Sequence, residues 1–257
     1  MGMSLLTMAM CVARLIVPPA ATYVFTIAAW RNVYLALLPV TLLAVVLAQY
    51  AAFPGQPGRI LALGPYLREA VEVLRRRAVA VSLLASAVSR GNVLVVTSFL
   101  GLHALSRLGL TSEQWAGIIF WSGVGSLVGS PVAGYLSDHF GKRRGFVSAS
   151  VLLALGCGLS AIATDALWLT GLLLVVSAVQ ALASVSVSAM ISELLPERRG
   201  LLASWTIVWG NAGVAAIAAL STALYTRGGY AWVVGTMVLM TLGAGVLSAA
   251  PERGRTL

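Results

Sequence analysis

The sequence predicts an all-α membrane protein with eight transmembrane helices, and three observations lead to this class. Hydrophobic residues make up 59% of the 257 residues and charged residues only 10%, with a mean hydropathy of +0.93, well above that of water-soluble domains. The apolar residues form continuous runs rather than an alternating pattern, which favours helices over a barrel. The cations gather in the short breaks between these runs, as membrane topology signals do.

Each predicted helix satisfies the length requirement for crossing a bilayer, which is about 20 mostly apolar residues. Short polar or Gly/Pro-rich breaks separate the runs, and the chain has no basic segment before its first run, so we do not interpret that run as a cleaved signal peptide. The predicted helices are 3–28, 32–51, 79–104, 113–136, 146–163, 166–192, 201–226 and 230–250.

One connection is much longer than the others. Residues 52–78 contain three prolines, three glycines and a basic end, which predicts an interfacial linker with a short amphipathic helix. The predicted organisation is therefore two transmembrane helices in 1–51, a cytoplasmic linker in 52–78, a six-helix unit in 79–250 and a cytoplasmic tail in 251–257.

The distribution of Lys and Arg predicts the orientation, because cations in short loops are retained on the cytoplasmic side. One set of helix ends carries twelve cations and the other carries three, while Arg14 and Arg90 lie inside predicted helices and complete the 17. This asymmetry predicts a multi-pass protein of the plasma membrane with both termini and the loops 134–145 and 193–200 in the cytoplasm. Since the cations form no continuous solvated patch, the net charge of +9 does not indicate a nucleic-acid partner.

The stretch GYLSDHFGKRRG, residues 134–145, concentrates charge between two apolar runs. Its spaced residues are Gly134, Asp138, Gly141, Lys142 and Arg143. This pattern resembles the loop signature of the major facilitator superfamily, in which an acid and two glycines precede a pair of cations. His139 stands where the family more often has Arg or Lys.

Two further stretches carry the same resemblance. SELLPERRG, residues 192–200, is followed by Asn211 and Gly213 in an apolar helix, and is similar to the family's junction between its tenth and eleventh helices. Trp30 and Arg31 at a tight turn resemble the junction between the fifth and sixth. The resemblance implies the last two helices of the N-terminal half followed by a complete six-helix C-terminal half. We expect an N-terminally truncated product, from a misplaced start or a genuine shortening, that lacks the first four helices.

A weak internal repeat agrees with this register. At an offset of 200 residues, Thr22 pairs with Thr222, Phe25 with Tyr225 and Thr26 with Thr226. The first two helices would then correspond to the last two of the six-helix unit.

The loop 134–145 is a candidate conformational switch. Asp138 has the chemistry to accept hydrogen bonds from Lys142 or Arg143, or to lie at the N-terminus of a neighbouring helix, near Ser4. The resemblance implies that this loop is a cytoplasmic latch, whose contact forms in one conformational state and breaks in the other. The alternative is that the loop only retains topology through its positive charge. Gly125 and Gly129 give the preceding helix a small-residue face suited to close packing.

Charged residues at membrane depth are the other candidate site. Arg14 and Arg90 each lie about twelve residues into a predicted helix, where an unneutralised cation costs about 3 kcal/mol or more. The resemblance places them on two helices that line the family's cavity, which implies an organic anion such as a carboxylate or phosphate ester. The alternative is a structural arginine that binds backbone carbonyls or snorkels. Asn92, Gln180 and Asn211 complete the cavity candidates because amides are costly to bury.

The leading functional hypothesis is secondary transport of a small solute by alternating access, with coupling to a proton or another ion left open. The alternative is a truncated, non-transporting membrane remnant or assembly subunit. An enzyme is not expected, because no nucleophile, base or carboxylate cluster lies at membrane depth. We predict no cofactor and no metal site, and Cys11 and Cys157 lack the spacing of ligands.

Overall fold

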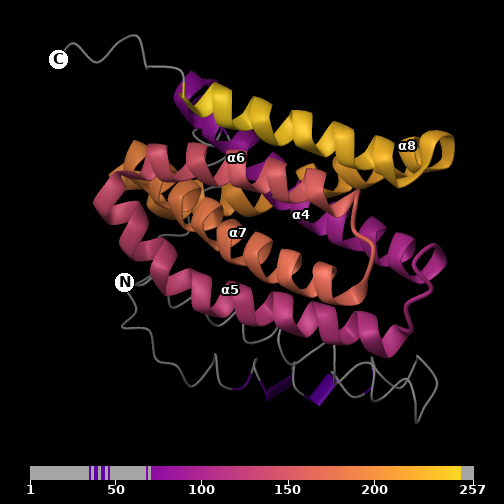
Figure 1. Cartoon of the computed structure of the whole chain (residues 1–257). Coiled ribbons are helices and arrows are strands. Elements are labelled where there is room, and N and C mark those ends of the chain that lie inside the picture. The colour runs from indigo at the N-terminus through magenta and orange to yellow at the C-terminus, as the bar shows by residue number, and fades with distance from the viewer. Residues whose placement is uncertain are drawn as a thin grey trace.

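A computed structural model describes residues 71–249 together with the isolated positions 35, 38, 39, 42, 43, 46 and 68. Its elements are α4 (Arg77–Ser106), α5 (Ser112–Phe140), α6 (Lys142–Ser160), α7 (Ala166–Leu194), the 3-10 turn η1 (Pro196–Arg198) and α8 (Arg199–Ala249) (Figure 1). The predicted all-helical architecture is confirmed for this part of the chain. Most of the first two predicted helices, with Arg14, and the tail 251–257 lie outside the described residues, so the count of eight helices stays a prediction.

The helix α8 contains a sharp break. At Gly229 the backbone has φ 70 and ψ −163, a conformation that glycine adopts without steric cost. We refer to residues 199–228 as the first part of α8 and residues 230–249 as its second part. The break falls between the predicted helices 201–226 and 230–250. By length and composition, four of the described helices are able to cross a membrane, namely α4, α5, α7 and α8.

The turns between helices follow from their local sequences. The Thr111 hydroxyl caps α5 by accepting a hydrogen bond from the backbone N–H of Gln114 at 3.2 Å. In return, Oε1 of the Gln114 side chain accepts one from the backbone N–H of Thr111 at 2.9 Å. Asp165 caps α7 by accepting from the Trp168 amide at 2.8 Å. Gly141, with φ 89, allows the chain to reverse between α5 and α6.

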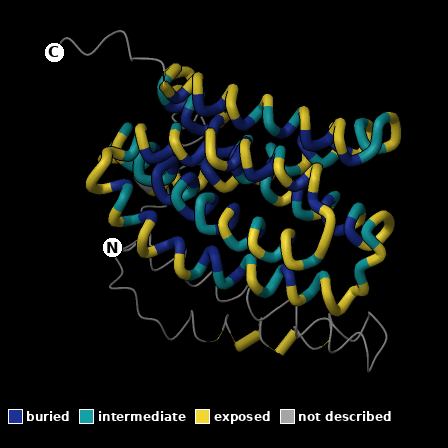
Figure 2. Tube along the Cα trace, in the orientation of Figure 1, coloured by how far each residue is buried: buried dark blue, intermediate teal, exposed yellow. Residues whose placement is uncertain are grey.

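The helices pack in preferred pairs. Helix α4 contacts mainly α8, α5 contacts mainly α7, and α6 lies against both α7 and α8. Buried residues line the inner faces, and exposed residues follow the outer faces (Figure 2). Large apolar side chains such as Leu239, which is 72% exposed, remain on the outside, as expected for helices in contact with lipid.

Glycines set the closeness of the α5–α7 pair. A Cβ atom on Gly125 would lie 2.1 Å from the backbone oxygen of Leu174, and one on Gly129 would lie 2.6 Å from the Cα of Ala178. The helices therefore meet backbone to backbone, which agrees with the small-residue face predicted from the sequence. Ser122 and Ser177 share a hydrogen bond of 2.6 Å across the same contact.

The α4–α8 pair is equally close. A Cβ atom on Gly213 would lie 2.7 Å from the Cβ of Ala87, and one on Gly91 would lie 2.5 Å from a side-chain carbon of Ile217. Asn92, also on α4, donates hydrogen bonds to the Thr241 hydroxyl and to the Met237 carbonyl, both on the second part of α8. Helix α4 thus contacts both parts of α8, which the break at Gly229 turns back on each other.

We predict that Gly125→Ala destabilises the fold, because the added methyl group meets the α7 backbone and the two helices must separate. Overpacking of this kind costs about 1 to 3 kcal/mol. The control is Gly117→Ala on the same helix, where a Cβ atom has nothing within 4 Å and alanine is the better helix former. Thermal unfolding in detergent measures both variants. Equal unfolding temperatures for the two would contradict the proposed contact.

Candidate functional site

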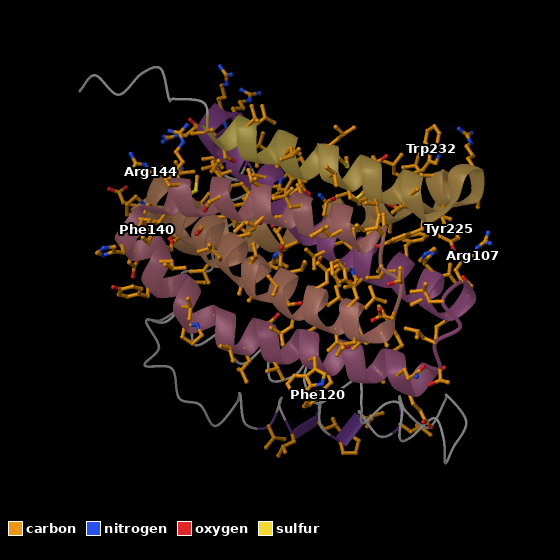
Figure 3. The ribbon with its side chains drawn as sticks, in the orientation of Figure 1. Arg107, Phe120, Phe140, Arg144, Tyr225 and Trp232 are labelled. Carbon is orange, nitrogen blue, oxygen red and sulfur yellow. The ribbon has the colours of Figure 1, made fainter. Side chains whose placement is uncertain are left out.

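The predicted switch loop lies at one end of the bundle, where α5 gives way to α6. Arg144 and Phe140 mark this end, and Arg107, Tyr225 and Trp232 mark the opposite one (Figure 3). The structure therefore separates the loops that the cation distribution assigns to opposite sides of the membrane. The two sets of loops lie at opposite ends of the bundle, and which end faces the cytoplasm stays a prediction.

Lys142 links the loop 134–145 to the end of α7. Its Nζ atom forms an ion pair with Oε1 of Glu193, in a pair whose side chains are 27% and 58% exposed. Glu193 belongs to the SELLPERRG stretch, but sequence reasoning gave it no role. This end of the bundle carries more cations than carboxylates, and this excess could have predicted that Glu193 pairs with one of the cations.

Arg143 and Gly141 connect α6 to its neighbours. The Nε atom of Arg143 donates a hydrogen bond to the carbonyl of Ser248 at 2.5 Å, which ties the start of α6 to the last turn of α8. Gly141 supplies the turn that brings both cations to these partners. At Gly134, one turn before Asp138, an added Cβ atom would meet no atom of another helix within 4 Å.

Asp138 lies exposed in the last turn of α5. Within residues 71–249 its carboxylate forms no hydrogen bond or ion pair, and the predicted contacts with Lys142 and Arg143 are not formed here because those cations contact Glu193 and Ser248. The other suggested partner, near Ser4, lies outside the described residues. A carboxylate in this position is available for a contact in a second conformation.

The cavity candidates fall into two groups. Arg90 lies close to the middle of the 30-residue α4 and is half-buried against the first part of α8. A Cβ atom on Gly210 would lie 3.0 Å from its Cδ and 3.3 Å from its Nη1, so a larger residue there would press against the Arg90 side chain. Asn211 follows directly and is exposed. Arg90 thus lies in the seam between α4 and the first part of α8, which we call the α4–α8 seam, and Asn211 borders this seam as the chain neighbour of Gly210.

Asn92 and Gln180 lie instead in the bundle interior. Both are buried, and Gln180 donates to the carbonyl of Ser89 at 3.4 Å and to the Ser184 hydroxyl at 3.3 Å. Their amide oxygens, Oδ1 of Asn92 and Oε1 of Gln180, are buried without a hydrogen-bond donor among the described residues. Such oxygens are suited to accept hydrogen bonds from hydroxyl groups or water. Gln180 reaches α4 at Ser89, which precedes Arg90 in the chain, whereas Asn92 contacts the second part of α8.

No group of His, Cys, Asp and Glu side chains capable of holding a metal occurs in the part of the chain that the structure describes. The arrangement offers guanidinium, amide and hydroxyl groups at membrane depth. Groups of these kinds have the chemistry to bind and orient a solute by hydrogen bonding.

Comparison with known proteins gives two findings. A family model described as Major Facilitator Superfamily matches residues 82–255. The "Arabinose-proton symporter" of Bacillus subtilis (strain 168) is 29% identical over 118 residues, which cover 44% of this chain and 25% of that relative. The matched stretch therefore spans about a quarter of the relative's length.

The ion pair between Lys142 and Glu193 gives a testable prediction. Lys142→Met and Glu193→Gln should each lower stability slightly, and the double variant should lose less than the sum of the two. The expected coupling is about 0.2 to 1 kcal/mol, typical of partly exposed pairs. Denaturant unfolding in detergent measures this cycle, with Asp138→Asn as the control that should leave stability unchanged. Strictly additive losses would show that the pair contributes nothing.

Proposed function

This chain belongs to the Major Facilitator Superfamily, and we propose that it carries a small solute across a membrane by alternating access. Family membership makes it an integral multi-pass membrane protein and points to a transporter rather than an enzyme. In this mechanism the six-helix unit rocks against its counterpart around a solute bound at mid-depth. We place both termini in the cytoplasm and the protein in the plasma membrane, on the basis of the cation distribution.

The proposed solute is an organic anion, and Arg90 is the observation that carries this choice. It is a half-buried guanidinium near the middle of a helix able to cross the membrane. A guanidinium offers a planar fork of donors that matches a carboxylate or phosphate ester. Asn211, which follows Gly210 in the chain, is exposed beside the α4–α8 seam and adds an amide that can both donate and accept.

A neutral sugar is the second candidate. The Bacillus subtilis relative is named for arabinose and a proton. The amide oxygens of Asn92 and Gln180 have no hydrogen-bond donor among the described residues, and sugar hydroxyls can supply one. These two side chains are buried, so this candidate requires an opening of the bundle interior. Coupling to a proton or another ion belongs to the same proposal.

The contacts at the switch loop are suited to such a cycle. An exposed ion pair contributes about 0 to 1 kcal/mol, so the contact of Lys142 with Glu193 can break without large cost. Asp138, exposed beside it, is free to engage a helix N-terminus in the other state. We propose that Gly134 and Gly141 shape this loop, and that its cations also retain it in the cytoplasm.

We predict that succinate binds the wild-type protein and that Arg90→Ala weakens this binding by roughly tenfold to a hundredfold, the usual value of charge-assisted hydrogen bonds. Arg75→Ala is the matched control, because Arg75 is an exposed cation before α4. Titration calorimetry in neutral detergent measures both, with L-arabinose as a second ligand. Unchanged succinate affinity in Arg90→Ala would overturn the anion assignment, and binding of arabinose alone would favour the sugar.

Flux into liposomes distinguishes transport from the alternative of a non-transporting remnant or assembly subunit. The assay compares this chain with a version that carries the preceding helices of a complete family member. Solute uptake by this chain supports the proposal, whereas uptake by the extended version alone would support the non-transporting remnant. Absence of flux from both would remove its main support.

A further inference from the structure

A pocket of about 540 Å³ lies at the end of the bundle opposite the switch loop. It is lined by the end of α4, the end of α6 and the break in α8, and we call it the terminal pocket. The lining residues that matter here are His103, Arg107, Tyr225, Gly229 and Tyr230. Arg107 and Tyr225 are seen at this end of the bundle (Figure 3).

The imidazole of His103 is held in a fixed plane. It stacks on the ring of Tyr230 with centroids 4.8 Å apart and an interplanar angle of 18°. The Tyr230 hydroxyl in turn shares a hydrogen bond of 2.7 Å with Ser160, whose hydroxyl donates to the carbonyl of Cys157 at 2.6 Å. Because stacking uses only the ring faces, the ring nitrogens of His103 remain available at the edge. Within residues 71–249 the imidazole makes no hydrogen bond.

Arg107 lies on the same side of α4 as His103. The two residues are four positions apart, and the Arg107 amide bonds the His103 carbonyl at 2.8 Å, so the helical register holds through this turn. The guanidinium is exposed and has no acid among the residues that line the pocket. Glu113 and Asp165, the acids of neighbouring helix starts, are not lining residues. The terminal pocket therefore favours an anion.

The depth of the terminal pocket matches the level of lipid headgroups. A helix of 30 residues such as α4 is about 45 Å long at 1.5 Å per residue. A bilayer including its headgroups is about 40 to 45 Å thick. Arg107 directly follows α4, and so lies where headgroup phosphates and soluble anions are both present.

We propose that the terminal pocket binds a phosphate group, with the Arg107 guanidinium as the main donor and the His103 imidazole and Tyr225 hydroxyl as further donors. A tetrahedral phosphate presents oxygens in several directions, which suits donors from two helices better than a planar carboxylate does. The phosphate belongs either to a lipid headgroup or to a free phosphate or phosphate ester. This inference does not depend on the transport of any solute.

The test uses the full chain in neutral detergent and two probes. Inorganic phosphate is titrated calorimetrically, and retained phosphatidylglycerol is measured by native mass spectrometry after purification from equal amounts of phosphatidylglycerol and phosphatidylcholine. Arg107→Gln should weaken at least one of the two by about tenfold or more. Arg227→Gln is the matched control, since Arg227 is exposed near the same break but does not line the pocket. His103→Gln should also weaken the binding of phosphate or the retention of phosphatidylglycerol.

Each result decides between outcomes. Loss of phosphate binding alone assigns a free anion, loss of phosphatidylglycerol alone assigns a lipid, and loss of both assigns a site open to either source. Because Arg107 is exposed, its variant should fold, and an unchanged unfolding temperature verifies this. The proposal is overturned if neither probe binds the wild-type protein, or if Arg107→Gln and Arg227→Gln have equal effects.

Discussion

Helices inside a bilayer gain little from excluding water, because lipid tails are as apolar as leucine side chains. Their association relies instead on close contact, and close contact requires small residues. In this protein Gly125 and Gly129 bring α5 against the backbone of α7, while Gly91 and Gly213 bring α4 against α8. The positions of the other side chains follow from these two contacts.

The close approach of α4 to both parts of α8 divides the polar residues into two environments. Asn92 meets Met237 and Thr241 on the second part of α8, where an amide in the interior joins helices. Arg90, two residues earlier, faces Gly210 on the first part. Because the chain turns at Gly229, both parts of α8 contact α4, and the two polar residues of α4 therefore face different parts of α8. In the described bundle the α4–α8 seam therefore holds the half-buried cation Arg90, close to the middle of α4.

Much of the helix pattern was predictable from hydropathy and turn residues. The predicted helices 79–104, 113–136 and 166–192 agree with α4, α5 and α7 to within a few residues. The predicted start at residue 146 was late, because α6 begins at Lys142 and carries its cations in its first turn, where Arg143 reaches Ser248. Charge alone suggested a loop there, whereas Gly141 had already made the turn.

The partners within the candidate site were harder to predict. Sequence spacing suggested that Asp138 pairs with Lys142 or Arg143, which are near it in the chain, but Lys142 contacts Glu193, a residue of another helix end. The amides Asn92 and Gln180 were grouped with Arg90 because of their polarity, and only the helix rotation separates them. Rotation is set by packing, and an all-round apolar helix carries little sequence signal about which face is turned inward.

Accessibility of Asn211 to water is the most direct test that the α4–α8 seam lines a solute pathway. Asn211→Cys, in a background with Cys11 and Cys157 replaced by serine, is reacted in liposomes with a membrane-impermeant maleimide added to both sides. Leu239→Cys provides the comparison, since Leu239 is 72% exposed on the second part of α8 and should contact lipid. We predict rapid labelling at 211 and none at 239. Equal labelling, or no labelling at 211, would contradict the account.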